Sequence, residues 1–419
     1  MKLTKYIFIL FLSMLLSACF SDVFRELLPF EIGEKTAYAA LSAVMYILVL
    51  AGDFVLSYIS LHTEGSEVWM DIYDRPLRGD ERIYGLDAVR FFAVISVPAV
   101  HFMGLTGYYE AQLKGGTMFF ATCIRWLFIC CVPLFLTLTG YFKHNKGINF
   151  AHYKSIFAVL ATHIFITCIR LYVDKSYHGV ELTGDYIMHK LVYFEYGWYV
   201  KLYIGIMLLI PFFNLIWSAL EERWHKELLI LTLVFLCSMG PLTYNIIPSS
   251  WVIIYVFIYY FMGAYLCDYE VYINKWLNAA LIVLMVCVIT AGGFLHPTEQ
   301  GTFNWNFAAY GDNSGYSSLP VVILTFLIMT FLIDADTGFK PVRVLFCSFS
   351  VVSLEMYMLS QMFDGIIYPK LEYAGFVDIF PRMPLVVGVV VLLSYVSSHI
   401  KRLIFMLFKI PLYIFNKKD

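Results

Sequence analysis

The most constraining feature of this sequence is one apolar stretch that contains both an arginine and a histidine. It runs from Leu86 to Leu105 as LDAVRFFAVISVPAVHFMGL, and Arg90 and His101 are eleven residues apart in it. Ionisable side chains at membrane depth are costly, and those that occur usually face the protein interior or a wet cavity and have a function. At about 100° per residue the two side chains project from one helix face, roughly 16 Å apart along the axis. The stretch therefore predicts a membrane helix with one polar face.

Composition places the rest of the chain in a membrane as well. Of the 419 residues 60% are hydrophobic and only 14% are charged, whereas soluble domains average about 25% charged residues. The predicted fold class is an all-α polytopic membrane protein. The net charge of −2 gives no indication of nucleic-acid binding. The nine cysteines show neither a CxxC pair nor the Cys/His spacing of a zinc site, so we expect no metal site and no disulfide framework.

Twelve apolar segments are candidate membrane spans. They cover residues 6–20, 37–61, 86–107, 118–142, 154–173, 197–217, 227–246, 251–267, 275–294, 317–333, 344–364 and 381–398. The first segment ends in a small-residue run before Cys19, so it is either an ordinary span or a lipoprotein signal with Cys19 as the modified residue. We expect an N-terminal extension over residues 1–82 with one or two spans and a cytoplasmic loop. A ten-span domain over 83–400 and a basic amphipathic tail over 401–419 follow it.

The distribution of lysine and arginine predicts the orientation of these spans. With the N-terminus inside, the segments on the inner side carry most of the lysines and arginines that lie outside the spans. Both termini and the polar segment 62–85 are therefore expected on the cytoplasmic side. The outer loop over 294–316 lacks Lys and Arg and is rich in Gly, Asn and aromatic residues. Such a loop suits a hydroxyl-rich ligand, but it is equally typical of a solvated loop.

Few ionisable residues lie inside the predicted spans, and this makes them candidates for a site. His101 near the membrane centre and Arg90 near the cytoplasmic end are the strongest, because they share a face and are costly to bury. Paired structural charges between helices explain the others equally well. Those others are Arg125, Arg170, Lys201, Glu195 and Asp364 towards the outer side, and His163 and Glu355 at mid-membrane.

At this point the sequence resembles a known family. LDAVRFFAVISVPAVH is similar to the first-span signature, Arg-x10-His, of the acyltransferase-3 family of integral membrane O-acyltransferases. Further stretches resemble the later motifs of the family in the expected order, over about residues 83–400. They are Val132-Pro133-Leu134-Phe135 with Thr139-Gly140-Tyr141, then WYVKLYIGIMLLIP from Trp198 to Pro211, then Tyr259 to Gly263, and Ser353 to Tyr357.

The resemblance implies a ten-helix core, with one or two additional helices before it in this chain, and an O-acetyltransferase activity. It implies transfer of an acyl group, usually acetyl, from cytoplasmic acyl-CoA to a hydroxyl of an extracytoplasmic or lipid-linked polysaccharide, with His101 as the catalytic residue and Arg90 as its partner. Acyl-CoA is a co-substrate, and no tightly bound cofactor is expected. Three departures stand out. Thr139 replaces the usual Ser, and residues 1–82 are additional to the family core. The paired arginines that often follow the second core span appear only as Lys143, Lys146 and Lys154, the expected CoA-binding groups together with Arg90.

The chemistry suits these residues independently of the resemblance. A sugar hydroxyl is a poor nucleophile, and a neutral histidine that takes its proton during attack on a thioester is a usual remedy. A guanidinium at the inner end of the span suits a phosphate or a carbonyl. The residues expected to bind substrate are Arg125, Arg170, Lys201 and Glu355.

Other readings of the sequence stay open. Many membrane spans and a polar path through them are also typical of a transporter or flippase for a glycan or lipid-linked intermediate. Such a protein more often shows an internal duplication or matching broken spans, and none is evident here. A structural subunit of an export complex does not require Arg90 and His101. The expected surroundings are a bacterial cytoplasmic membrane with its lipids and a glycan acceptor, and the sequence does not specify whether the protein forms a homo-oligomer.

Overall fold

The computed structural model describes residues 33, 35–36, 39–44, 46–47, 83–148, 150–239, 246–304, 315–335 and 339–407. The chain divides into two compact units, residues 1–75 and 76–419. In the first unit, the described residues after Gly33 are helical. The predicted span over 6–20, the candidate lipoprotein cysteine at Cys19 and most of the polar segment 62–85 lie outside the described residues. Most of the span over 37–61, residues 305–314 of the outer loop and the tail beyond Leu407 do so too.

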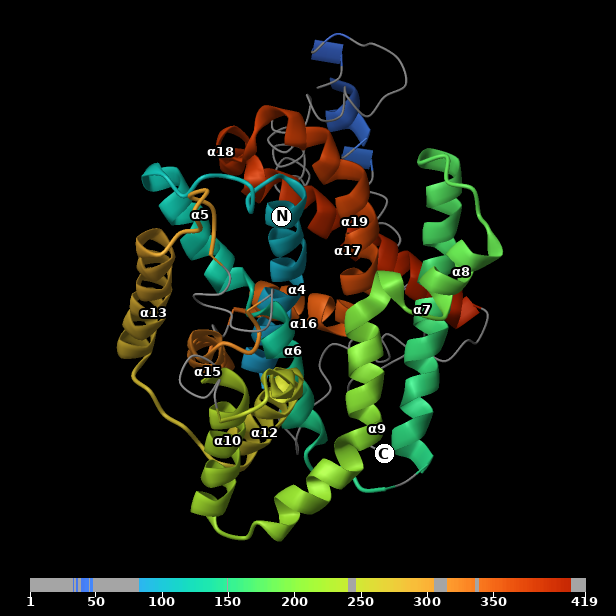
Figure 1. Cartoon of the computed structure of the whole chain (residues 1–419). Coiled ribbons are helices and arrows are strands. Elements are labelled where there is room, and N and C mark those ends of the chain that lie inside the picture. Colours follow the sequence, from blue (N-terminus) through green and yellow to red (C-terminus); the bar gives the residue numbers. More distant parts are fainter. Residues whose placement is uncertain are drawn as a thin grey trace. The chain divides into compact units, whose positions relative to one another are not determined.

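The described part of the second unit is built from helices and contains no strand (Figure 1). The α-helices are α4 Tyr84–Leu105, α5 Gly115–Phe128, α6 Cys131–Lys143, α7 Phe150–Tyr177, α8 Gly184–Leu191, α9 Trp198–Ala219, α10 Arg223–Ser238, α12 Tyr255–Asp268, α13 Lys275–Leu295, α15 Leu319–Ile333, α16 Lys340–Val351, α17 Ser353–Ile367, α18 Phe376–Ile379 and α19 Met383–Leu407. Short 3-10 helices are η1 Glu195–Gly197, η2 Ser249–Ile254, η3 Tyr368–Ala374 and η4 Phe380–Arg382.

Each of the ten spans predicted after residue 83 contains a helix. Within the described residues, seven helical segments are long and apolar enough to cross a bilayer, or eight when one bent pair counts as a single span. The helices of the two remaining predicted spans, α10 and α15, are shorter. The predicted fold class, an all-α polytopic membrane protein, is thus confirmed.

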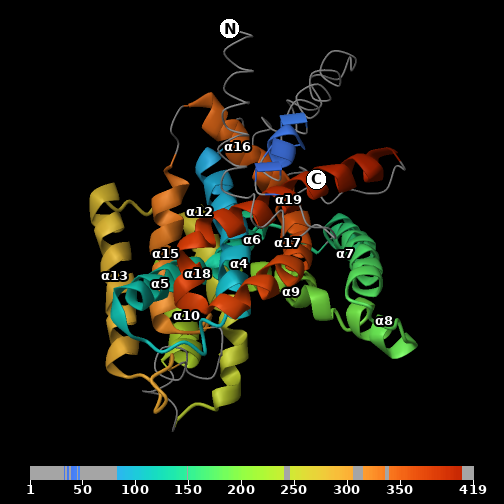
Figure 2. The same cartoon turned by 90° about the horizontal axis from the view of Figure 1, so that it is seen from above.

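Helix α4 lies among the other helices rather than at their edge. It packs against α5, α6, α15, α16, α17 and α19, and in both views it is enclosed by them (Figures 1 and 2). Leu86, Val89, Ala93 and Val97, spaced three or four residues apart, are all buried, as expected for the packed side of a helix. Asp87, Arg90 and Ser96 of α4 are buried as well, so these polar residues face protein.

Glycines bring α6 and α12 into direct backbone contact. A Cβ atom on Gly140 would lie 1.9 Å from the carbonyl oxygen of Tyr260, and one on Gly263 would lie 1.9 Å from that of Thr137. Small residues at such positions allow close helix packing inside a membrane. Close packing of the helices thus explains the glycine in each of two sequence motifs, Thr139-Gly140-Tyr141 and Tyr259 to Gly263.

Helices α16 and α17 together are long and apolar enough for one broken membrane span or for a re-entrant loop. The two parts are bent by 74° at Val352, where the helical backbone is interrupted. The Ser353 hydroxyl donates to the carbonyl oxygen of Ser350 across the break, at 3.0 Å. Such breaks are tolerated at membrane depth where the freed backbone is buried in protein or lines a cavity. This one lies beside α4.

Candidate functional site

Arg90 lies at the break between α16 and α17. Its Nη1 donates to the Ser350 hydroxyl at 2.9 Å, and its Cζ is 4.4 Å from the ring centroid of Phe142 on α6. The side chain is 2% exposed. A guanidinium held over an aromatic face and by a hydroxyl has its orientation fixed by two different interactions. Arg90 is therefore a preorganised cation inside the helix assembly.

A hollow with about 510 Å³ of empty space, which includes its opening to solvent, adjoins Arg90. Its wall comes from four helices, α4, α6, α9 and α17. The lining residues are Arg90, Phe135, Leu138, Thr139, Phe142, Lys143, Tyr199, Tyr203, Ser353, Leu354 and Tyr357. We name this space the Arg90 hollow. Its wall is mostly aromatic and aliphatic, with Arg90 and Lys143 as its basic members, and this suits a ligand that carries both an apolar part and an anionic group.

His101, further along α4, pairs with an aspartate. Its Nδ1 lies 2.6 Å from Oδ2 of Asp364 on α17. The His101 side chain is 24% exposed, whereas the Asp364 side chain is 1% exposed. If the Asp364 carboxylate is ionised it can only accept a hydrogen bond, and then Nδ1 carries the proton and Nε2 keeps a lone pair. The pair thus presents a basic ring nitrogen from a fixed imidazole.

The contacts of Arg90 and His101 show that α4 and α17 run in the same direction. Arg90 lines a hollow together with Ser353 at the start of α17, and His101 contacts Asp364 further along α17. The Tyr368 hydroxyl of η3 donates to the carbonyl oxygen of Pro98, which precedes His101 on α4, at 3.0 Å. Eleven residues of helix separate Arg90 from His101 by roughly 16 Å. The two side chains share a face, as predicted, but the residue that contacts His101 is Asp364 and not Arg90.

Arg170 approaches the same part of α17. Its Nη1 donates to the carbonyl oxygen of Gln361 at 2.7 Å, and a Cβ atom on Gly365 would lie 3.2 Å from its Nη2. Its Nε is 3.6 Å from Oδ1 of Asp174, and its Cζ lies 4.5 Å from the ring centroid of Tyr196. The residues it touches on α17 flank Asp364. Of the four predicted substrate-binding residues, Arg170 is the one that the structure brings next to the His101–Asp364 pair.

Glu355 belongs to a buried ion pair between α17 and α19. Lys401 Nζ lies 3.1 Å and Arg402 Nε 3.4 Å from Oε1 of Glu355, and Lys401 also donates to the Thr162 hydroxyl at 2.9 Å. Glu355 is 1% exposed. Because α19 continues to Leu407, the two cations predicted for the surface tail are buried inside the protein. These contacts fit the alternative in which Glu355 belongs to a structural pair of charges between helices better than a role in substrate binding.

Arg125 and Lys201 lie apart from both Arg90 and His101. Arg125 is fully buried in α5, with its Cζ 4.2 Å from the ring centroid of Trp126 and 5.3 Å from that of Phe303. Lys201 is exposed on α9. Neither residue lines the Arg90 hollow. Their predicted role in substrate binding stays a prediction.

The basic residues expected to hold the CoA phosphates differ in position. Lys143 is half-buried and lines the Arg90 hollow, and Lys146 is half-buried in the loop after α6. The carbonyl oxygens of both accept from Nδ2 of Asn214 at 2.7 Å, so this loop is tied to α9. The side chain of Lys154 lies outside the described residues. Lys143 is thus the one that shares a cavity with Arg90.

His163 and Glu195 have structural partners instead. Nε2 of His163 is 3.1 Å from the carbonyl oxygen of Leu191, and the ring stacks on Phe194 with centroids 4.1 Å apart. Glu195 pairs with Lys190.

Asp364 was considered as an ionisable residue inside a span but was not assigned to the site. The sequence predicts Asp364 towards the outer side and His101 near the membrane centre, in two spans that run in the same direction. Depth alone does not choose a partner for His101 among the ionisable residues, and so the pairing comes from the structure.

Comparison with known proteins gives one match. A family model described as an acyltransferase domain, that of acyltransferase family 3, matches residues 83–399, about three quarters of the chain. No curated protein and no solved structure matches. The matched segment contains Arg90, His101, Asp364 and the Arg90 hollow.

Proposed function

Because the chain belongs to the acyltransferase-3 family, we propose that it is an O-acetyltransferase that uses the His101–Asp364 pair to acylate a polysaccharide. The acyl group, most simply acetyl, comes from cytoplasmic acyl-CoA. The acceptor is a hydroxyl of an extracytoplasmic or lipid-linked polysaccharide of the cell envelope, such as an exopolysaccharide. The observation that carries this proposal is the hydrogen bond from His101 to Asp364 on the face that also holds Arg90.

The chemistry follows from the orientation of His101. Nε2 takes the proton of the acceptor hydroxyl while that oxygen attacks the thioester carbonyl carbon. Asp364 holds the imidazole in the required tautomer and stabilises the imidazolium that forms. The C–S bond then breaks, and the imidazolium returns its proton to the leaving thiolate. The products are an O-acyl ester and free CoA. A base of this kind contributes roughly 10²–10⁴-fold to the rate.

The Arg90 hollow is the proposed entry for the acyl donor. Arg90 and Lys143 offer positive charge to the phosphates, and the aromatic wall suits the uncharged pantetheine arm. The roughly 16 Å of helix between Arg90 and His101 is on the order of the length of that arm. Acyl-CoA thus acts as a co-substrate that binds and leaves in each turnover.

The acceptor approaches from the opposite side of His101 in this proposal. Arg170 and the hydroxyls of Tyr186 and Tyr196, both of which contact Asp174, form a polar cluster beside the Asp364 segment of α17. Arginine and tyrosine side chains suit a polyhydroxylated ligand, since they offer donors and flat faces. The protein accordingly lies in a bacterial cytoplasmic membrane, with the donor inside and the acceptor outside.

Replacing His101 by alanine tests the proposal. We expect His101→Ala to abolish acylation and to leave membrane insertion intact, because it removes the base without removing a span. Surface glycans are analysed by mass spectrometry in cells that make the wild-type protein, the variant or no protein. Acylation is detected as a mass gain of one acetyl group for each modified sugar. Normal acylation by the variant refutes the mechanism, and unchanged glycan masses without the protein refute the activity. The structural-subunit reading predicts no effect of His101→Ala.

A further inference from the structure

A second hollow adjoins the first across the last turn of α6. It holds about 350 Å³ of empty space, again including its opening, and its wall includes Leu86 of α4, Cys267 of α12 and residues 141, 142, 144 and 145. Phe142 lines both hollows, and Arg90 lies over its ring. Lys143 lines only the Arg90 hollow, whereas Asn145 lines only the second. The two spaces are therefore neighbours that share one aromatic wall.

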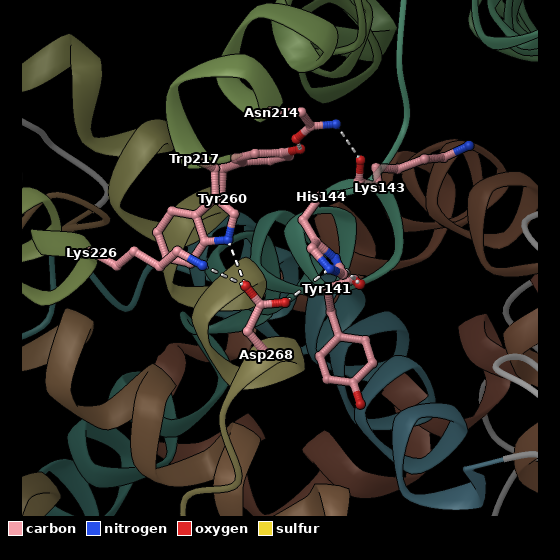
Figure 3. A network of polar contacts seen from close by, with 8 residues as sticks. All are labelled: Tyr141, Lys143, His144, Asn214, Trp217, Lys226, Tyr260 and Asp268. Atoms are coloured by element: carbon pink, nitrogen blue, oxygen red, sulfur yellow. Dashed lines mark hydrogen bonds and ion pairs between the residues drawn. The ribbon is translucent and has the colours of Figure 1, made fainter. Parts of the chain in front are cut away.

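The wall of the second hollow is held by a polar network (Figure 3). Asp268 accepts from Nε1 of Trp217 at 2.8 Å and from Nζ of Lys226 at 3.0 Å, and its other oxygen is 3.2 Å from Nε2 of His144. Nδ1 of His144 is 3.1 Å from the carbonyl oxygen of Tyr141. Both ring nitrogens of His144 are thus engaged, and the ring is fixed in the wall of the hollow.

The chemistry of this wall suits a flat heteroaromatic base. Tyr141 and Phe142 offer rings 5.6 Å apart at 71°, and the exposed Asn145 offers an amide that both donates and accepts. Purine bases are recognised in proteins by stacking on aromatic side chains together with hydrogen bonds to their edges. Lys143 and Arg90 line the neighbouring Arg90 hollow, Arg90 with its guanidinium over the ring of Phe142, so positive charge suited to the phosphates of a nucleotide lies in the adjoining space.

We propose that the second hollow binds the adenine of the acyl donor, with the phosphates at Lys143 and Arg90. This inference rests on the proposed use of acyl-CoA and adds the site of its nucleotide. Fifteen residues of α4 separate Leu86, in the second hollow, from His101, which is about 22 Å along the helix. An extended pyrophosphate and pantetheine arm is on the order of 20 Å long. A base in the second hollow therefore lets the thioester reach His101.

The test is direct binding to the purified full-length protein, and it needs no acceptor. Radiolabelled CoA is titrated, adenosine 3′,5′-bisphosphate serves as a competitor, and pantetheine serves as a ligand without a nucleotide. Asn145→Trp fills the mouth of the second hollow with an indole, and Asn145→Ala removes only the amide. Gln112→Trp, at an exposed position beyond the other end of α4, is the matched control.

We expect the bisphosphate to displace CoA from the wild-type protein and from Gln112→Trp. Asn145→Trp should weaken CoA binding at least about tenfold, which is the order of magnitude of one lost base stack. Asn145→Ala should weaken it by a smaller factor, and pantetheine should bind all variants alike. Unchanged CoA affinity in both Asn145 variants, or CoA that the bisphosphate cannot displace, overturns the nucleotide site alone. A wild-type protein that binds neither CoA nor pantetheine overturns the proposed function as well.

Discussion

Asp364 gives His101 a defined role at the level of single residues. A lone histidine in a membrane helix can present either nitrogen, but the 2.6 Å contact with Asp364 engages Nδ1 and leaves Nε2 for the substrate. The difference in exposure agrees with this division, since the imidazole is partly accessible and the carboxylate is covered. The pair therefore has the arrangement of a base and its orienting group.

Replacing Asp364 by asparagine should slow catalysis and leave the binding of the donor intact. The amide can donate to Nδ1 and so favours the tautomer in which Nε2 carries the proton, which removes the base. We expect kcat to fall by about 10²–10⁴-fold with little change in KM for acetyl-CoA. Steady-state kinetics in reconstituted membranes measures both constants.

The matched control is Asp185→Asn on α8. Asp185 is 88% exposed and lies 3.8 Å from the exposed His189, so its loss should change neither constant. Full activity of Asp364→Asn, or an equal loss in Asp185→Asn, contradicts the orienting role of Asp364.

Arg90→Lys separates the geometry of the guanidinium from its charge. Lysine keeps the charge but cannot reproduce a planar group that lies over Phe142 while it donates to Ser350. We expect KM for acetyl-CoA to rise about tenfold, which corresponds to the loss of roughly one such interaction. Arg223→Lys, which loses guanidinium contacts with Glu227 and the Tyr265 hydroxyl but lies outside the Arg90 hollow, is the control and should leave KM for acetyl-CoA unchanged. If Arg90→Lys has the same kcat and KM as the wild-type protein, only the charge of Arg90 matters and not the geometry of its guanidinium.

At the scale of the elements, two glycines decide how closely α6 and α12 pack. Gly263→Ala places a methyl group 1.9 Å from the carbonyl oxygen of Thr137, so the helices must separate. We expect a loss of about 1–3 kcal/mol in the free energy of unfolding, as for overpacking in a core. The midpoint of thermal unfolding in detergent reports this loss. Gly205→Ala on α9 has nothing within 4 Å of the added carbon, so it should not destabilise the protein. Equal midpoints for the two variants contradict the packing argument.

Much of the arrangement of helices could be predicted from the sequence. Apolar runs and turn signals located a helix in each of the ten spans after residue 83, because spacing and hydropathy are local properties. The polar face of α4 was predicted for the same reason, since the 3.6-residue period fixes which side chains share a face. The family resemblance was confirmed by the match over residues 83–399.

The pairing between helices could not be predicted in this way. Asp364 is 263 residues from His101, and Lys401 is 46 residues from Glu355. A helical period indicates that a face is polar but not which helix lies opposite it. The break at Val352 also left no signal, because that position is apolar and has neither Gly nor Pro beside it. The two long-range pairs and the break at Val352 depend on tertiary packing, which the local sequence pattern does not show.

At the scale of the whole membrane domain, the directions of the helices show which residues lie at the same end of the domain and which lie at opposite ends. α4 and α17 run in the same direction, because Arg90 lines a hollow with Ser353 at the start of α17 and His101 contacts Asp364 further along it. α19 runs against α17, because Lys401, near its end, pairs with Glu355 near the start of α17. The Arg90 hollow and the second hollow therefore lie towards the end where α4 begins, and His101 lies towards the other.

The proposed reaction requires the beginning of α4 to face the cytoplasm, where acyl-CoA is made. Gln112 follows α4, whereas Asn145 follows α6 and lines a hollow with Leu86 near the start of α4, so the two exposed residues mark opposite ends. We expect Gln112→Cys to react with an impermeant maleimide in intact cells, and Asn145→Cys to react only after permeabilisation. The exposed Cys168 is replaced by serine in both proteins. The reverse labelling puts Arg90 on the outer side, away from the donor, and refutes the two-sided route of the acyl group.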